Sequence, residues 1–445
     1  MSNPDRLTPS TAFIDELNAQ VKQSIAELEP AAPLIQPAYS GQRELWGIAV
    51  AAMKDLRPAL EKLSLNIHEH PEVAFEERFA ADTIARFIEE RGIAVERGAF
   101  GVPTALRATF GSGEVSVAFL SEYDALPGIG HACGHNLIAA SGVGAFLSAV
   151  EAVRAAGKEK EATVVFLGTP AEEGHSGKEY LIREGAVADL DAALMLHPFD
   201  LDIASHAWVG RRSAVVTFTG VSAHASSQPF MGRNALDAAT LTYQGLGLLR
   251  QQMPPSDRLH AVITEGGDRP SIIPNSATVE LYVRSLHAAT LVDLSQRVAD
   301  VCRGAALMTG CSVDIHWDPH PPTLPVRNNQ AMAERWRESQ AEQGIQALPA
   351  GVVPESIAAS TDFGNVSHLV PGIHPLVKIA PKGVALHTDE LREAACSSEG
   401  LAAMIRGATS LAQVGLDVLF DAHFRTKLRR EFEETGPAIT VNDLF

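Results

Sequence analysis

Short apolar runs and longer stretches with helical spacing alternate through the first half of the chain. An apolar run of about four to eight residues is typical of a buried strand, whereas apolar residues recurring every three to four positions predict a helix. On this basis we expect strands at 115–120, 163–168 and 192–196, and helices at about 136–156 and 177–185. Strands that alternate with helices predict an α/β fold with a mixed, mainly parallel sheet covered by helices on both faces.

The N-terminal segment is predicted to be helical and to pack against this α/β unit. Residues 11–63 favour two helices separated by a Pro-containing loop at 29–37. Residues 68–77 are expected to form a turn, and an amphipathic helix then ends at Gly92.

The pattern changes after Trp208. Two repeats of strand, helix and strand follow, which predict an inserted α+β sandwich of four strands and two helices. The expected strands are 215–219, 261–264, 278–284 and 312–317, and the expected helices are 234–250 and 289–309.

A Pro-rich run at 318–325 is expected to be a stiff linker back to the first unit. The remainder, residues 328–445, is expected to contain helices near 330–343 and 397–418 with short apolar segments and loops between them, and to complete the first sheet. The predicted division is a first α/β part at 1–207 with its helical extension, an inserted domain at 208–322, and a second α/β part at 323–445.

Composition narrows the classes of function. The chain has 445 residues, 46% of them hydrophobic, and a net charge of −18. Such a charge repels nucleic acid and anionic membranes, and we expect neither as a partner. The first twenty residues lack the pattern of a signal peptide, and no uninterrupted run of about eighteen apolar residues is present, so we expect a cytoplasmic protein. Four scattered cysteines do not make a disulfide framework, which leaves Cys133 open as a ligand.

Polar residues gather where the predicted strands end. The first strand runs into EYDALPGIGHACGHN (122–136), the second into GTPAEEGHSG (168–177), and the third into His197 of MLHP; VALHTDE places His387 in a late loop. Strand-end loops of an open α/β sheet converge on one crevice. Thiolate, imidazole and carboxylate together suit zinc, or manganese where oxygen and nitrogen dominate.

The spacing of these residues favours a hydrolytic site. Cys133 and His135 lie two positions apart, so that in extended backbone both side chains face the same way. Two ions about 3.5–4 Å apart can activate a water, while one of two adjacent glutamates binds metal and the other transfers the proton. We therefore expect metal-assisted hydrolysis of an amide.

These motifs, in their order, resemble metallopeptidase family twenty. They are HxHPExxFEE, EYDALPG, HACGHN, PAEEG, MLHP, GVSAHAS, IPN and a late LHT. The similarity is to the cysteine-containing amidohydrolase branch, which holds aminoacylase-like enzymes, plant hormone-conjugate hydrolases and aminobenzoyl-glutamate hydrolases. The stretch at 360–375 resembles the subgroup that holds one of the aminobenzoyl-glutamate hydrolase subunits and the β-alanyl dipeptidase-like proteins. The resemblance covers about residues 63–416.

The resemblance implies a zinc-peptidase-like catalytic domain with an inserted lid, through which such enzymes often form homodimers. It implies two divalent metal ions per subunit, zinc or manganese. The side chains that it assigns as metal ligands are Cys133, His135, Glu173, His197 and His387. Cys133 would bridge the two ions, and Glu172 would be the general base and acid.

Lid residues are also implied by the resemblance. His224 matches a histidine that stabilises the tetrahedral oxyanion, often in the partner subunit's site. Asn275 and Arg284 would hold the carbonyl or terminal carboxylate of the substrate, because the planar guanidinium fork suits carboxylates. Asn136 departs from branch members that have Asp there, which limits the transfer of their substrate preference.

Each motif alone has a structural explanation. A CxH pair can be structural, and an EE pair can be a solvated helix start. His197 could simply end a strand, His387 could be an ordinary loop residue, and His224 could lie on the lid surface. Asp124 is expected to orient a ligand, His131 to be structural or adjacent to a ligand, and His70 to shape a turn.

Two functions follow from these residues. The first is a metal-dependent amidohydrolase or dipeptidase that cleaves a small N-acyl amino acid, an aminobenzoyl-glutamate-like conjugate or a β-alanyl dipeptide. The alternative is a catalytically inactive relative that acts in binding or assembly. The first is favoured, because a scaffold has no physical need for Glu172 and the whole ligand set.

Overall fold

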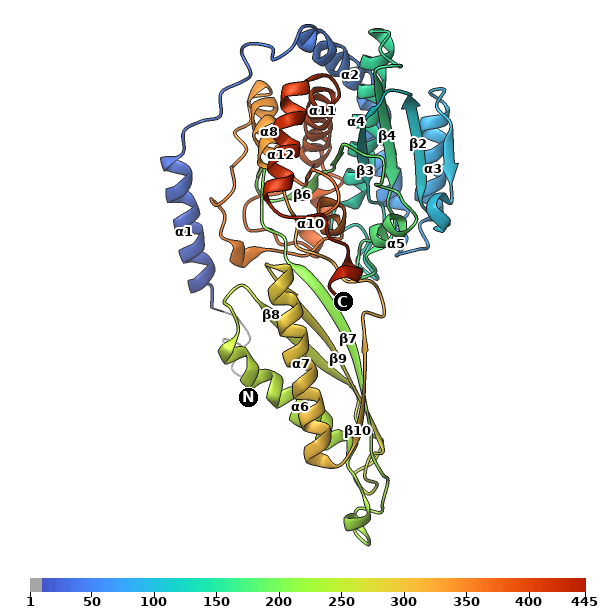
Figure 1. Cartoon of the computed structure of the whole chain (residues 1–445), viewed down its shortest axis with the longest axis vertical. Coiled ribbons are helices and arrows are strands. Elements are labelled where there is room, and N and C mark those ends of the chain that lie inside the picture. The colour runs from blue at the N-terminus through green and yellow to red at the C-terminus, as the bar shows by residue number, and fades with distance from the viewer. Residues whose placement is uncertain (1–9) are drawn as a thin grey trace.

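The computed structural model describes residues 10–445 and contains two separate main sheets. The first is a six-stranded sheet with the strand order β1-β2-β4-β3-β5-β11, and the second is a four-stranded sheet with the order β10-β7-β9-β8. Figure 1 shows the first sheet within the helices of the upper part and the second sheet below it. The strands of the first sheet are β1 (Val95–Arg97), β2 (Leu106–Gly111), β3 (Val115–Ser121), β4 (Ala162–Gly168), β5 (Ala192–Leu194) and β11 (Gly372–Ile373).

The six-stranded sheet is mixed and mainly parallel, as predicted. β3 pairs in parallel with β4 and β5, and β5 pairs in parallel with β11. β1 and β2 join the other edge in antiparallel orientation. These two edge strands were not predicted, because their short segments carry arginines and a glutamate among the apolar residues.

Helix α4 (His135–Ala155) is the central helix of the first unit and packs on β3 and β4. It is long and apolar enough to cross a membrane by composition, but 94% of its most apolar window is buried inside the protein. The helix also packs against two further helices, α2 (Gln42–Glu69) and α11 (Ser398–Phe420), of which α11 contacts β3 as well. The apolar residues of α4 are therefore part of the protein core.

The N-terminal helices differ in part from the prediction. α2 continues to Glu69, so His68 is helical and the expected turn begins later. α1 (Ala12–Glu27) extends along one side of the molecule and buries only Leu17 and Val21 among its sixteen residues (Figure 1). α3 (Arg78–Glu89) covers the β1 edge, with its apolar face inward.

The four-stranded sheet belongs to residues 210–317, which fall inside the predicted insertion. Its strands are β7 (Gly210–Thr219), β8 (Arg258–Glu265), β9 (Ser276–Ser285) and β10 (Ser312–Trp317), and all of its pairings are antiparallel. α6 (Ala235–Leu249) and α7 (Ala288–Thr309) pack on one face over a core of alternate strand residues such as Val216 and Val279. The helices leave the opposite face of the sheet uncovered. We call this unit the lid.

The C-terminal part returns to the first unit. Asn329 caps α8 (Gln330–Glu342), and α11 lies against β3. A small additional pairing joins β6 (His197–Phe199) to β12 (Leu376–Lys378) in parallel. The remaining helices of this unit are α5 (Gly177–Arg183), α9 (Phe363–Ser367), α10 (Asp389–Ala394) and α12 (Ala422–Glu434).

Candidate active site

The Cys133–Gly134–His135 segment turns sharply into the N-terminus of α4. Gly134 has φ of 79°, and a Cβ atom there would lie 2.8 Å from Cγ of Pro198. Only glycine fits this combination of positive φ and close packing. The extended backbone predicted for this segment is therefore wrong: His135 is the first residue of α4, and the turn at Gly134 brings the two side chains to the same place.

Asp124 orients two of the candidate ligands. Its Oδ1 lies 3.1 Å from Nδ1 of His135, which leaves Nε2 of that ring free for another partner. Its Oδ2 accepts a hydrogen bond of 2.9 Å from the backbone N–H of Glu173. One carboxylate thus fixes both the imidazole and the glutamate loop, which is the orienting position expected for Asp124.

Glu172 and Glu173 lie in a strained loop between β4 and α5. Ala171 and Ser176, on either side of the pair, have φ of 61° and 56°, in the left-handed region that few non-glycine residues adopt. The N–H of Ala171 donates to Oε1 of the buried Glu77, at 2.8 Å. Strain that is held in place by buried contacts is concentrated at functional sites.

His197 and His387 approach from two other parts of the first unit. His197 is not in the loop after β5 but begins β6, and its Nε2 lies 3.4 Å from Sγ of Cys133. His387 has φ of 63°, its N–H donates to the carbonyl of Ala132 at 3.0 Å, and its Nε2 lies 3.5 Å from Oε1 of Glu173.

The ligand atoms of these residues fall into groups of metal-binding size. Cys133, His135 and His197 form one triad, and Cys133, Glu173 and His387 form another, with the ligand atoms of each triad within 4.8 Å of one another. Within residues 10–445, the buried Nε2 of His135 and Oε1 of Glu173 have no hydrogen-bond partner. Buried polar atoms without partners are costly, and soft and borderline donors of this kind suit zinc. The residues of the two triads, which have Cys133 in common, therefore fit bound metal ions.

The third group joins His135 and Glu173 to Glu172. Burial and the neighbouring carboxylate of Glu173 raise the pKa of Glu172 well above its usual value. Burial would also raise the pKa of Glu173, but the contacts with His387 and His135 outweigh it and lower that pKa. The two adjacent glutamates thus have different environments, as different roles require.

A buried cation lies behind this cluster. Nζ of Lys178 donates to Glu122 and, at 2.6 Å, to Oδ1 of Asp362, and all three side chains are at most 1% exposed. The second oxygen of Glu122 lies 3.5 Å from Nε2 of His135. The sequence pattern did not single out Lys178 or Asp362, because a charged residue in a loop or helix start is normally solvated.

Asn136 faces away from the cluster. Its Nδ2 donates to Oγ of Ser64 and to the carbonyl of Ala395, each at 2.9 Å, and it lies inside the helical layer. His131 is also buried, and neither of its ring nitrogens has a partner among the described residues.

One pocket gathers most of the predicted site residues. Its lining includes Cys133, Glu172, Glu173, His197, His387 and Arg284. The same pocket is lined by Arg211 and Arg258 of the lid, which the sequence pattern did not indicate. Arg211 was missed because the strand was expected to begin at 215, whereas the structure begins β7 at Gly210.

His224 and Asn275 do not lie in this pocket. Both are exposed in the lid beyond the ends of its strands, near the bridge between His224 and Ile272. The backbone N–H groups of Ser226 and Ser227 donate to Nδ1 of His224, each at 3.2 Å. The structure therefore does not bring these two residues to the candidate ligand cluster of the same chain.

The chain is similar to known proteins over most of its length. The family described as Peptidase family M20/M25/M40 matches residues 118–414. The chain is 38% identical over 411 residues to the Xaa-Arg dipeptidase of Mus musculus, covering 89% of this chain and 95% of that protein. It is 28% identical over 464 residues to a p-aminobenzoyl-glutamate hydrolase subunit of Escherichia coli, covering 88% and 95%.

Solved structures show the same fold. The aminobenzoyl-glutamate utilization protein of Klebsiella pneumoniae superposes with a TM-score of 0.64 at 21% identity, covering 82% of this chain and 97% of that one. The YXEP protein of Bacillus subtilis, a dinuclear metal binding peptidase, gives a TM-score of 0.59 at 19% identity, covering 82% and 99%. On the family match and the Xaa-Arg dipeptidase identity together, this chain belongs to Peptidase family M20/M25/M40.

Proposed function

We propose that this protein is a metal-dependent amidohydrolase or dipeptidase that cleaves the amide bond of a small N-acyl amino acid or dipeptide. The observation that carries the proposal is the pair of ligand triads that share Cys133, with Glu172 beside them in one pocket. A scaffold that only binds or assembles would gain nothing from burying these groups without hydrogen-bond partners.

The five residues of the two triads would hold two ions, and Cys133 belongs to both triads. When bound, the ions would supply electrophilic activation of the substrate carbonyl and of water, and zinc and manganese both suit the donor set. Glu172 would accept a proton from the attacking water and deliver it to the departing amine. Asp124 would hold His135 and the Glu173 backbone in place for these steps.

Substrate recognition would come from the lid. Arg284 lines the pocket from β9, and within residues 10–445 its guanidinium has no ion-pair or hydrogen-bond partner, so it is available to a substrate carboxylate. We further propose that His224 and Asn275 act in the site of a partner subunit, in a homodimer formed through the lid, because both are exposed and neither lines the pocket of its own chain.

The names of two relatives indicate a class of substrate. One is an Xaa-Arg dipeptidase and another is a p-aminobenzoyl-glutamate hydrolase subunit. Both names denote amides of an amino acid, and we propose that this chain acts on the same general class. The four cysteines are free, as suits the cytoplasmic location that we propose.

The test is hydrolysis of a panel of N-acyl amino acids and β-alanyl dipeptides by protein loaded with zinc or manganese. Glu172→Gln should keep its metal and its unfolding temperature but lose about 10²–10⁴-fold in kcat. Glu184→Gln, an exposed glutamate at the end of α5, is the matched control and should leave kcat unchanged. Failure to retain metal after loading, or unchanged turnover in Glu172→Gln, would count against the proposal.

A second variant tests the lid. His224→Ala should lower turnover while the unfolding temperature stays near that of the wild type, because the side chain is exposed. Turnover equal to that of the wild type would show that His224 has no role in the reaction and is an ordinary residue of the lid surface.

A further inference from the structure

Three arginines lie side by side across the lid sheet. Arg284 of β9 is directly opposite Arg211 of β7 on one side and Arg258 of β8 on the other. Side chains of directly opposite residues in antiparallel strands point to the same face. The three guanidinium groups therefore form a row, which we call the arginine row, on the face that α6 and α7 leave uncovered.

The arginine row has no acidic partner. Within residues 10–445, no carboxylate oxygen lies within 4.0 Å of a nitrogen of these three guanidiniums, whereas the adjacent Arg212 pairs with Asp318 at 2.6 Å. Arg211 donates to the carbonyl of Gly174 and to Ser176, each at 3.2 Å. Acidic residues outnumber basic ones in this chain, which has a net charge of −18, so three neighbouring arginines without an acidic partner are not expected from its composition.

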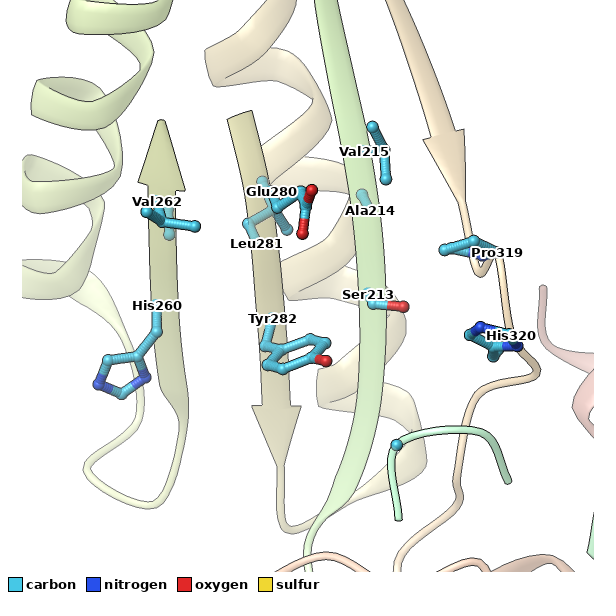
Figure 2. Close-up of a pocket in the computed structure, with 12 residues that line it drawn as sticks. Ser213, Ala214, Val215, His260, Val262, Glu280, Leu281, Tyr282, Pro319 and His320 are labelled. Carbon is cyan, nitrogen blue, oxygen red and sulfur yellow. The ribbon is translucent and has the colours of Figure 1, made fainter. Parts of the chain in front are cut away.

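Aromatic contact helps to position two of the three arginines without neutralising their charge. The guanidinium carbons of Arg211 and Arg284 lie 5.3 and 5.1 Å from the centre of the Tyr282 ring. Figure 2 shows Tyr282 with His260 and Ser213 at one level across three strands, the level next to the arginine row. Burial and, after it, the nearby positive charge of Arg211 lower the pKa of Arg284. The two guanidinium groups therefore lie close enough to repel each other.

The row faces the candidate active site. Arg211, Arg258 and Arg284 line the same pocket as Glu172 and His387. Contacts of Arg211 with Gly174 also place the row next to the residue that follows Glu173. A substrate whose scissile amide lies at the metal triads would therefore place its departing amino acid against the row.

We propose that the arginine row selects amides whose departing amine is an acidic amino acid, with a second carboxylate in addition to the one at the α-carbon. This inference rests on the proposed function and narrows its substrate class. Arg284 alone can take one carboxylate in a bidentate contact. A second carboxylate would give Arg258 and Arg211 the acidic partner that they lack. The guanidinium of Arg258 otherwise donates to backbone carbonyls, those of Pro255, Asp257 and Ser356. A basic side chain in the same place would face three like charges.

The experiment compares three substrates that share one acyl group. The 4-aminobenzoyl amides of glutamate, glutamine and lysine are assayed with metal-loaded wild-type protein for kcat/KM. We expect the glutamate amide to exceed the glutamine amide by about 10- to 100-fold and the lysine amide to be the poorest. Arg258→Gln should bring the glutamate-to-glutamine ratio close to one. Arg303→Gln, an exposed arginine on α7, is the control and should leave the ratio unchanged.

Binding of the free amino acids gives a readout that does not need turnover. Calorimetric titration of the metal-loaded protein with glutamate and glutamine should show tighter binding of glutamate by about tenfold or more, and this difference should be lost in Arg258→Gln. Equal binding and equal kcat/KM of the two, or preference for the lysine amide, would overturn the inference. Hydrolysis of the glutamine and lysine amides in that case would leave the proposed function intact. Absence of hydrolysis of any amide, together with selective glutamate binding, would instead overturn the proposed function alone.

Discussion

Removal of the buried cation at Lys178 should strongly destabilise the protein. Lys178 donates to both Glu122 and Asp362, and all three side chains are buried. Lys178→Met keeps most of the volume and removes the charge. Two carboxylates are then left buried together without their cation.

The expected cost follows from the contacts that remain. In Lys178→Met, Oδ2 of Asp362 still accepts the backbone N–H of residue 178 at 2.9 Å, but Glu122 keeps only the 3.5 Å approach to Nε2 of His135. Removing one member of a buried ion pair typically costs about 3–5 kcal/mol. We expect a loss of this size in the free energy of unfolding, at pH values where both carboxyl groups would otherwise be ionised.

A compensated variant separates charge from packing. The triple variant Lys178→Met, Glu122→Gln, Asp362→Asn has no buried charge in this cluster and should recover most of the loss, because neutral replacement of a buried ion cluster is often tolerated.

Urea unfolding followed by circular dichroism, in the presence of a chelator, measures the difference without a contribution from metal. Lys158→Met removes a partly exposed pair with Glu161 and should cost less than about 1 kcal/mol. The reasoning is refuted if Lys178→Met costs no more than this control, or if the triple variant is no more stable than Lys178→Met.

Three further predictions concern the pH dependence of stability, the turn at Gly134 beside the candidate metal ligands, and the effect of metal removal. Burial lowers the pKa of His206 and of His368 to about 4, against an ordinary value of 6.5. Since the unfolded chain then binds more protons than the folded one, the free energy of unfolding should fall by about 2 kcal/mol per histidine from pH 7 to pH 5; a His368→Gln variant with the wild-type pH slope would contradict this. Gly134→Ala should lower metal content and cost about 1–3 kcal/mol, because it adds backbone strain and a clash with Pro198; full metal occupancy by mass spectrometry would argue otherwise. Chelation should lower the unfolding temperature and metal should restore it, since a ligand at a hundredfold its Kd adds about 3 kcal/mol; calorimetric scans unaffected by chelator would speak against a bound metal.

The periodicity of the chain predicted the central architecture because its strands are buried on both faces. β3 and β4 are continuous apolar runs, and α4 and α11 are long helices whose apolar residues meet them. The short edge strand β1 could not be predicted in this way, because its three residues are partly or fully exposed and two of them are charged. β7 was predicted too short because the two arginines at its start interrupt the apolar pattern, although both are buried.

The candidate site was predictable where residues adjoin strand ends. Glu173 and His387 lie in the expected loops, while His197 lies instead at the start of β6. The arginine row could not be predicted, because it depends on the register of three strands that are far apart in the sequence or on opposite sides of a turn. The role of Lys178 could not be predicted either, because its two acidic partners come from segments far from it in the chain.

Metal content per chain, measured by mass spectrometry on wild type and on three single variants after loading, tests the central claim most directly. Cys133 belongs to both triads, whereas His197 and His387 belong to one each. The wild type should hold two ions, His197→Ala and His387→Ala about one, and Cys133→Ala fewer than either histidine variant. A wild type that holds no transition metal, or a Cys133→Ala variant that still holds two, would contradict the account.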